Sequence, residues 1–320
     1  VNNFLKKKNF SKSPNTTPVI SKQPQSFIDI GMNASGFKKL YEQLNPEQRQ
    51  AVDAVEGSVM GIAGPGTGKT QILTLRIANI LAKTDIDAEA ILAVTFTEAG
   101  VIAMRKRLAE IIDSRAYEVS ISTFHGFAQS VIQKYPESFP RIIGSINITE
   151  ADQIRIMEEL LEETKGLKIL RPFGDRMHYL RDILSSIQTL KREGIDTSQF
   201  ITIVENNRSE FDKRDDLFHE KGAYKGKMKG EHKDTEKQIE KNRELGILYE
   251  AYQQKLTEEK LYDFDDMIME TLLAMKTDAD LLLQLQEKYQ YVLVDEHQDT
   301  NNEQNRILER IGFDLSLPKY

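Results

Sequence analysis

The chain has 320 residues, 39% of them hydrophobic and 29% charged, so it can form two globular domains and has an ordinary globular composition. It contains no cysteine, which excludes a disulfide framework and a thiolate metal site and indicates a reducing, cytoplasmic setting. No apolar stretch approaches the ~20 residues of a membrane helix, and the N-terminus lacks the apolar core of a signal peptide. We therefore expect a soluble protein without a membrane partner.

The charge of the chain is unevenly distributed. The formal net charge is −7, but residues 1–38 contain six lysines and one acidic residue, which leaves +5 on this tail and −12 on the remainder. The tail is rich in Asn, Ser, Pro and Lys and has no hydrophobic periodicity, which predicts a disordered basic tail. A solvated leader and a segment that touches DNA phosphates both fit this composition.

From about residue 40 onward, short apolar runs alternate with amphipathic helical patterns. The predicted strands and the helices that follow them are 58–63 and 70–82, 91–95 and 98–112, and 119–122 and 124–135. Strands that alternate with helices indicate βαβ units. We therefore predict an α/β domain in which a parallel sheet is flanked by helices.

The pattern changes after residue 140. Residues 150–260 show helical stretches and no clear strand, and strand character returns in YQYVLVDE at 289–296. One α/β domain interrupted by an all-helical insertion explains this order more simply than two domains in series. The predicted boundaries are 1–38 for the tail, 39–148 for the first part of the α/β domain, 149–260 for the insertion and 261–320 for the second part.

A glycine-rich stretch, GIAGPGTGKT at 61–70, lies between a predicted strand and a predicted helix, as in a phosphate-binding loop. The N–H groups of such a loop can surround a phosphate because glycine has no Cβ, and the helix adds its positive N-terminal end. The strict pattern has glycine where this chain has Ala63, and a glycine-rich turn with an exposed lysine is the alternative. The residues expected to bind a nucleotide are Ala63, Gly64, Pro65, Gly66, Thr67, Gly68, Lys69 and Thr70.

Two carboxylates, Asp295 and Glu296, follow the last predicted strand. In P-loop proteins a strand-terminal aspartate completes a Mg²⁺ site, and a neighbouring glutamate can accept a proton from the attacking water. A solvated pair of acids at a strand end is the alternative. We expect Lys69, Asp295 and Glu296 to be catalytic. Thr70 and Asp295 are expected to hold Mg²⁺, with ATP as the nucleotide.

Six stretches together resemble, in order and spacing, the N-terminal half of superfamily 1 DNA helicases of the UvrD/Rep/PcrA type. They are LNPEQRQAV (44–52), GIAGPGTGKT (61–70), ILAVTFTEAG (91–100), ISTFHGFAQ (121–129), YDFDDMI (262–268) and VLVDEHQDTNNEQ (292–304). The resemblance covers roughly residues 40–310. It implies a RecA-like P-loop NTPase domain with an inserted all-helical domain, and ATP-driven 3′-to-5′ translocation on single-stranded DNA in repair or replication.

The same resemblance assigns roles to further residues. It places six on single-stranded DNA: Thr95, Phe96, Thr97, Thr123, Phe124 and His125. An aromatic ring there can stack on bases and a threonine can contact phosphates, whereas a core phenylalanine and a structural histidine are the alternatives. Gln48 resembles the glutamine that reads adenine, since an amide offers both a donor and an acceptor, and a helix-cap position is its alternative. Asp263–Asp266 is expected to be structural.

The sequence departs from the family's usual pattern at several points. Gln71 stands where arginine is typical, and Glu98 stands where a lysine-containing turn is expected. His297 replaces an aromatic residue and is not expected to be catalytic, although it can couple the acid pair to neighbouring loops.

Residues 305–320 supply neither the Gly-Asp-x-x-Gln strand nor the second RecA-like domain with which the family continues. Arginines of that second domain stabilise the transferring phosphate. We expect the domain in cis, and expect this chain alone to be incomplete for turnover. A non-hydrolysing ATP- and DNA-binding module and the helicase part of a helicase-nuclease subunit are the alternative functions.

Overall fold

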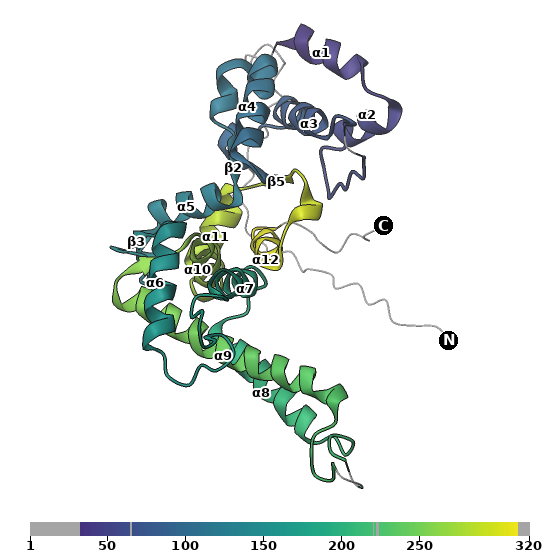
Figure 1. The fold of residues 1–320 in the computed structure, drawn as a ribbon. Coiled ribbons are helices and arrows are strands. Elements are labelled where there is room, and N and C mark those ends of the chain that lie inside the picture. Colours follow the sequence, from purple (N-terminus) through teal and green to yellow (C-terminus); the bar gives the residue numbers. More distant parts are fainter. Residues whose placement is uncertain (1–32, 65, 220, 222–223, 313–320) are drawn as a thin grey trace, which may run out of the picture.

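The computed structural model describes residues 33–312 except 65, 220, 222 and 223. A parallel sheet lies between two helical layers, and a helical section extends away from it (Figure 1). The sheet has the order β2-β1-β5, formed by β1 (Ile91–Thr95), β2 (Ser120–Thr123) and β5 (Tyr291–Val294). The predicted α/β fold is confirmed.

Each face of the sheet is covered by its own set of helices. One set is α1 (Ala34–Glu42), α2 (Pro46–Asp53), α3 (Lys69–Lys83) and α4 (Glu98–Ile112). The other set is α5 (Phe124–Lys134), α10 (Phe264–Thr277), α11 (Ala279–Lys288) and α12 (Asn302–Arg310). Successive strand residues point to opposite faces, so Ile91 packs with the first set and Leu92 with the second. Burial on both faces explains why β1 is apolar without alternation.

The strand predicted at 58–63 is not formed, and that prediction is wrong. Val59 and Ile62 are 39% and 69% exposed. A strand requires a neighbour for its backbone N–H and C=O groups, and among the described residues β5 pairs only with β1. The apolar run before the loop therefore has no ladder partner in this part of the chain.

Residues 1–32 of the predicted disordered tail lie outside the described residues, but its boundary at residue 38 falls inside α1. This helix begins at Ala34 because the Asn33 side chain accepts a hydrogen bond of 2.9 Å from the Gly36 N–H. Phe37 and Tyr41 stack on the same helix with ring centroids 5.7 Å apart. The folded region therefore starts before residue 38.

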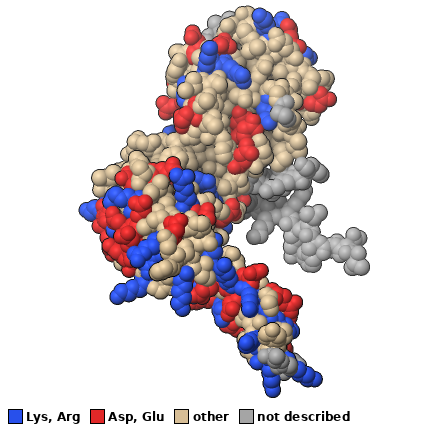
Figure 2. Space-filling model, viewed as in Figure 1, with Lys and Arg blue, Asp and Glu red and all other residues tan. Residues whose placement is uncertain are grey.

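The helical section contains α6 (Glu150–Glu163), α7 (Leu180–Arg192), α8 (Thr197–Asp212) and α9 (Gly230–Glu258). Its own core joins α6, α7 and α9, whereas α8 and the distal half of α9 form a long hairpin that projects away (Figure 1). Lysine and arginine side chains gather at the free end of this hairpin (Figure 2). Among the described residues, no helix combines the length and apolar character needed to cross a bilayer.

The two ends of the helical section lie side by side. The chain leaves the α/β region through β3 (Ile146–Asn147) and returns through β4 (Leu261–Tyr262), and these two short strands pair in parallel. This pairing agrees with an insertion whose ends share one attachment point. The domain boundaries at 148 and 260 stay predictions.

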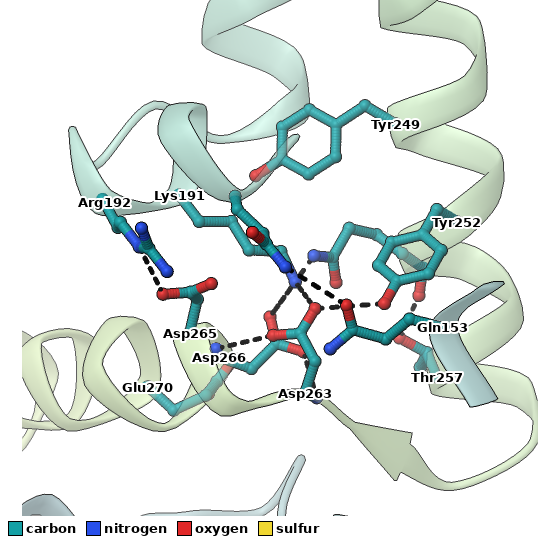
Figure 3. Close-up of polar contacts among 12 residues, drawn as sticks. Gln153, Lys191, Arg192, Tyr249, Tyr252, Thr257, Asp263, Asp265, Asp266 and Glu270 are labelled. Carbon is teal, nitrogen blue, oxygen red and sulfur yellow. Dashed lines mark hydrogen bonds and ion pairs between the residues drawn. The ribbon is translucent and has the colours of Figure 1, made fainter. Parts of the chain in front are cut away.

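A buried ionic cluster joins the helical section to α10 (Figure 3). Lys191 of α7 is 0% exposed, and its Nζ contacts Asp263 Oδ2 and lies 2.8 Å from Asp266 Oδ1. Burial opposes the charge, but the carboxylates of Asp266 and Asp263 raise the pKa of Lys191 above its ordinary value. Tyr252 of α9 donates a hydrogen bond of 3.2 Å to Asp263. These contacts agree with the structural role expected for Asp263–Asp266.

Candidate nucleotide and nucleic-acid site

The glycine-rich loop runs directly into α3. Gly66 and Gly68 have φ angles of 76° and 82°, a left-handed conformation that glycine adopts without strain. Gly68 is the N-cap of α3, and the Thr67 hydroxyl donates a hydrogen bond of 2.8 Å to the Gly64 carbonyl. Lys69 and Thr70 therefore occupy the first turn of a helix whose N-terminal end favours anions. Pro65 lies outside the described residues, and the nucleotide contacts of Ala63 and Gly64 stay predictions.

The acid pair lies against this first turn, although it is far away in sequence. The Thr70 hydroxyl donates a hydrogen bond of 3.0 Å to Asp295 Oδ2. The Nζ of Lys69 lies 3.1 Å from Glu296 Oε2. Parallel strands end at one edge of the sheet, so β5 delivers its acids to the edge where α3 begins. The four residues expected to be catalytic or to hold Mg²⁺ thus meet in one place.

Glu296 has an unusual backbone conformation. Its φ and ψ are 53° and 43°, in the left-handed region that costs a residue with a Cβ about 1–3 kcal/mol and that recurs at functional sites. Hydrogen bonding from Gln298 and from Lys69 lowers the pKa of Glu296. Its carboxylate is therefore deprotonated at neutral pH, as a proton acceptor must be.

The side chains beside the loop fit a magnesium ion. A threonine hydroxyl and a carboxylate are hard oxygen ligands, and Mg²⁺ usually takes only one or two protein ligands, with phosphate oxygens and waters completing its octahedron. Thr70 and Asp295 present such a pair. The described residues contain no group of three or more His, Cys, Asp or Glu side chains that would hold a metal unaided.

Gln48 reaches the same loop from α2. Its Nε2 donates a hydrogen bond of 3.1 Å to the Thr67 carbonyl, while its Oε1 accepts one of 2.9 Å from the Asn45 N–H in a capping box. Gln48 therefore caps α2, as the alternative interpretation proposed, and also contacts the glycine-rich loop. Contact with adenine stays a prediction; the hydrogen bonds to Thr67 and Asn45 leave one Nε2 hydrogen and one Oε1 lone pair of Gln48 for it.

The residues predicted to contact DNA lie where β1 and β2 end side by side, with Thr95 opposite Thr123 in the ladder. Phe96 is 37% exposed and meets Phe124 edge to face at 6.2 Å between ring centroids. Thr97 is also exposed, and its hydroxyl accepts from the Gly100 N–H. Phe96 and Thr97 are therefore available to a ligand.

Three other members of the predicted set are turned inward. Thr95 is 4% exposed, Thr123 is 7% exposed, and Phe124 is 3% exposed within the core under α5. Their side chains are buried because they follow buried strand residues and pack under the next helix. Direct contact with a ligand is therefore open to the exposed members of the set, and Phe124 supports the Phe96 ring from the core side.

His125 forms a contact that the sequence did not reveal. Its ring stacks on Phe264 with centroids 3.6 Å apart and an interplanar angle of 17°, and its Nε2 is buried without a hydrogen-bond partner among the described residues. Burial lowers the pKa of His125 to about 4, so the ring is neutral at pH 7. His125 therefore offers no positive charge to a phosphate.

Comparisons with known proteins bear on this arrangement. The sequence pattern of the family described as "UvrD/REP helicase N-terminal domain" matches residues 44–315. The chain belongs to this family. It is 28% identical over 277 residues to "ATP-dependent DNA helicase UvrD1" of Mycobacterium tuberculosis, which covers 86% of this chain and 31% of that protein. It is 28% identical over 273 residues to "ATP-dependent DNA helicase PcrA" of Staphylococcus epidermidis, which covers 85% of this chain and 32% of that protein.

Membership of the UvrD/REP helicase family confirms the resemblance drawn from the six motifs. The small parallel sheet flanked by helices agrees with the RecA-like N-terminal domain of that family. The chain spans about a third of the length of these relatives.

Phe264 is a candidate site residue that sequence reasoning missed. It lies inside the DFDD stretch, where the acids alone drew attention, yet its ring is 52% exposed and stacks on a residue of the predicted DNA element. An aromatic residue at the first position of a helix beside an acidic cap was the available signal. Its partner lies far away in sequence, so only the fold shows the stack.

Proposed function

We propose that this chain is the ATP- and single-stranded-DNA-binding part of an ATP-dependent DNA helicase that translocates 3′ to 5′. The observation that carries the proposal is the meeting of Lys69 and Thr70 with Glu296 and Asp295 at one edge of the sheet. Relatives about three times as long bear the name ATP-dependent DNA helicase. We propose that a second RecA-like domain in cis completes the nucleotide cleft.

Each group at the nucleotide site has a distinct task in this proposal. The loop N–H groups and Lys69 bind the phosphates, and the lysine exchanges the Glu296 carboxylate for phosphate oxygens when ATP binds. Thr70 and Asp295 would hold Mg²⁺, which would supply charge neutralisation on the phosphates. Glu296, released from Lys69, orients the attacking water and accepts its proton.

The DNA path in this proposal follows the strand ends. Phe96 provides a ring for base stacking, and the Phe264 ring, supported by His125, provides a second. Base stacking on an aromatic ring tolerates any sequence, as a translocating motor requires. We propose that Thr97 contacts a phosphate; its exposure at the N-terminus of α4 supports this role.

Calorimetric titration with Mg-ADP and a non-hydrolysable ATP analogue tests the nucleotide site. Lys69→Ala is expected to abolish binding because the phosphates lose their neutralising ammonium. Lys83→Ala is the matched control, since Lys83 ends the same helix and pairs with Asp53 at 3.5 Å, away from the loop. Equal nucleotide affinity of wild type and Lys69→Ala would contradict the proposal.

Fluorescence anisotropy with a labelled oligothymidine tests the DNA path. Phe96→Ala is expected to weaken binding by ~1–3 kcal/mol, with a similar loss on other sequences. Phe173→Ala is the control, because Phe173 is an exposed phenylalanine between α6 and α7. Deletion of residues 1–32 separates the groove from the basic tail. If this deletion abolished binding while folded Phe96→Ala bound normally, the tail and not the groove would hold the DNA.

A further inference from the structure

Two helix N-termini meet at the proposed DNA path. Thr97 caps α4 and Thr123 caps α5, at the ends of neighbouring strands. Glu98 is the first residue of α4, is exposed, and accepts a hydrogen bond of 3.0 Å from the Thr123 hydroxyl. A carboxylate therefore lies across two helix ends that would otherwise favour a phosphate.

The Thr123 hydroxyl already donates one hydrogen bond and accepts another. A hydroxyl has one hydrogen to donate and two lone pairs. The Thr123 oxygen accepts from the Gly126 N–H at 3.0 Å, and its hydrogen goes to Glu98. Thr123 consequently has no hydrogen left for a DNA phosphate while Glu98 holds this position, which agrees with its burial at 7% exposure.

A purely structural account of Glu98 also exists. An acidic residue in the first turn stabilises a helix through its dipole, and Glu150 does the same at the first position of α6, after the cap Thr149. The two glutamates differ in one respect. The capping threonine of a neighbouring helix donates to Glu98, beside the exposed Phe96.

We propose that Glu98 acts as an internal substitute for a DNA phosphate and thereby weakens the binding of single-stranded DNA. The Glu98 carboxylate accepts the only hydrogen of the Thr123 hydroxyl and adds negative charge beside Phe96 and Thr97. A DNA phosphate that binds here must therefore displace the carboxylate. This inference rests on the proposed DNA path. It identifies Glu98 as a residue that sets affinity in the groove.

Oligothymidine binding by Glu98→Ala and Glu98→Gln tests the proposal. At low salt we expect Glu98→Ala to bind about three to ten times more tightly, because one hydroxyl becomes free to donate and one like charge is removed. The gain should shrink as salt is added, because salt screens the repulsion between the Glu98 carboxylate and the DNA phosphates. Glu98→Gln should show a smaller gain, since the charge is lost but the amide oxygen still accepts from Thr123. Glu150→Gln, at the equivalent helix position, should leave the affinity unchanged.

Thr123→Val separates a specific contact from a general charge effect. In the wild-type background this change should alter affinity little, because the hydroxyl already binds Glu98. In the Glu98→Ala background it should remove part of the gain in affinity, because the freed hydroxyl is lost, provided circular dichroism shows a folded protein. Equal gains in Glu98→Gln and Glu150→Gln would reduce the effect to surface charge and overturn the proposal.

The proposed DNA path and the role of Glu98 fail in different ways. If Phe96→Ala weakens binding but neither Glu98 variant strengthens it, the path stands and the role of Glu98 is refuted. If wild type does not bind and Glu98→Ala does, the inhibitory role of Glu98 is supported. If neither binds, both the path and the role of Glu98 are refuted.

Discussion

Two lysine–carboxylate clusters in this molecule share their chemistry and differ in their access to water. Lys69 and Glu296 lie 3.1 Å apart with side chains 25% and 37% exposed. Lys191 contacts Asp263 and Asp266, and these three side chains are 0%, 3% and 1% exposed. Water can stabilise the separated partners of the first pair, so Lys69 can exchange its carboxylate for a phosphate. The second cluster has no such alternative, because separated charges in the interior are very costly.

Exposure therefore assigns the two clusters to different functions. An exposed ion pair contributes about 0–1 kcal/mol to folding, whereas removal of one partner from a buried pair costs about 3–5 kcal/mol. The exposed pair of Lys69 and Glu296 can therefore separate at little cost to the stability of the fold. The buried one holds α7 and α9 against α10, which carries Phe264 at its first position.

The largest expected effect is that of Lys191→Met, which leaves the buried Asp263 without its cation and leaves Asp266 only Arg141, at 3.4 Å. We expect the free energy of unfolding to fall by about 3–5 kcal/mol at pH 7, measured by urea denaturation followed by circular dichroism. Lys38→Met is the control, since Lys38 pairs with Glu42 at 3.9 Å on an exposed face, with side chains 75% and 63% exposed. If both variants lost the same small amount, the distinction between the clusters would be refuted.

Glu303 of α12 is nearly as buried as the Lys191 cluster, at 4% exposed, and its carboxylate is influenced by Lys276 and Arg306. Burial raises the pKa of Glu303 to about 7, although Lys276 and Arg306 act in the opposite direction. The folded protein therefore holds this proton more tightly than the unfolded chain. The stabilisation that comes from protonated Glu303 is fully present below the ordinary glutamate pKa. It is lost as the pH rises through about 7.

Glu303→Gln, which imitates the protonated acid, should remove that pH dependence. At pH 8 we expect the variant to be more stable than wild type by about 1–2 kcal/mol, and the difference should vanish below the ordinary glutamate pKa of 4.5. Denaturation curves across this range measure it. Glu309→Gln on the exposed side of the same helix is the control. A variant less stable than wild type at pH 8 would show that Glu303 is charged and satisfied in the fold.

The smallest expected change in stability is that of Lys69→Ala. Although we expect this variant to lose nucleotide binding, its free energy of unfolding should change by less than about 1 kcal/mol, because the pair with Glu296 is partly exposed. The same urea series measures it. A loss comparable to that of Lys191→Met would mean that Lys69 is a structural residue, which would end the contrast between the two clusters.

Local sequence patterns predicted most of the α/β elements closely. β1 and α4 have the predicted bounds, Ile91–Thr95 and Glu98–Ile112, because a doubly buried strand and a threonine-capped helix are encoded by neighbouring residues. The six motifs also indicated the family and brought Lys69 and Asp295 into one hypothesis, since chemistry at a phosphate requires particular residue types at particular spacings. These features depend on a few adjacent positions.

Whatever depends on a distant partner was decided by the tertiary structure. The run at 58–63 has strand composition but no neighbour in the described chain. Phe96 and Phe124 look alike in sequence, yet one is 37% exposed and the other 3%. Lys191 has the sequence context of an ordinary helical lysine, and only the fold surrounds it with the aspartates of α10. Burial, pairing and pKa depend on side chains that the fold brings together from remote segments. Residue type and periodicity therefore do not predict them.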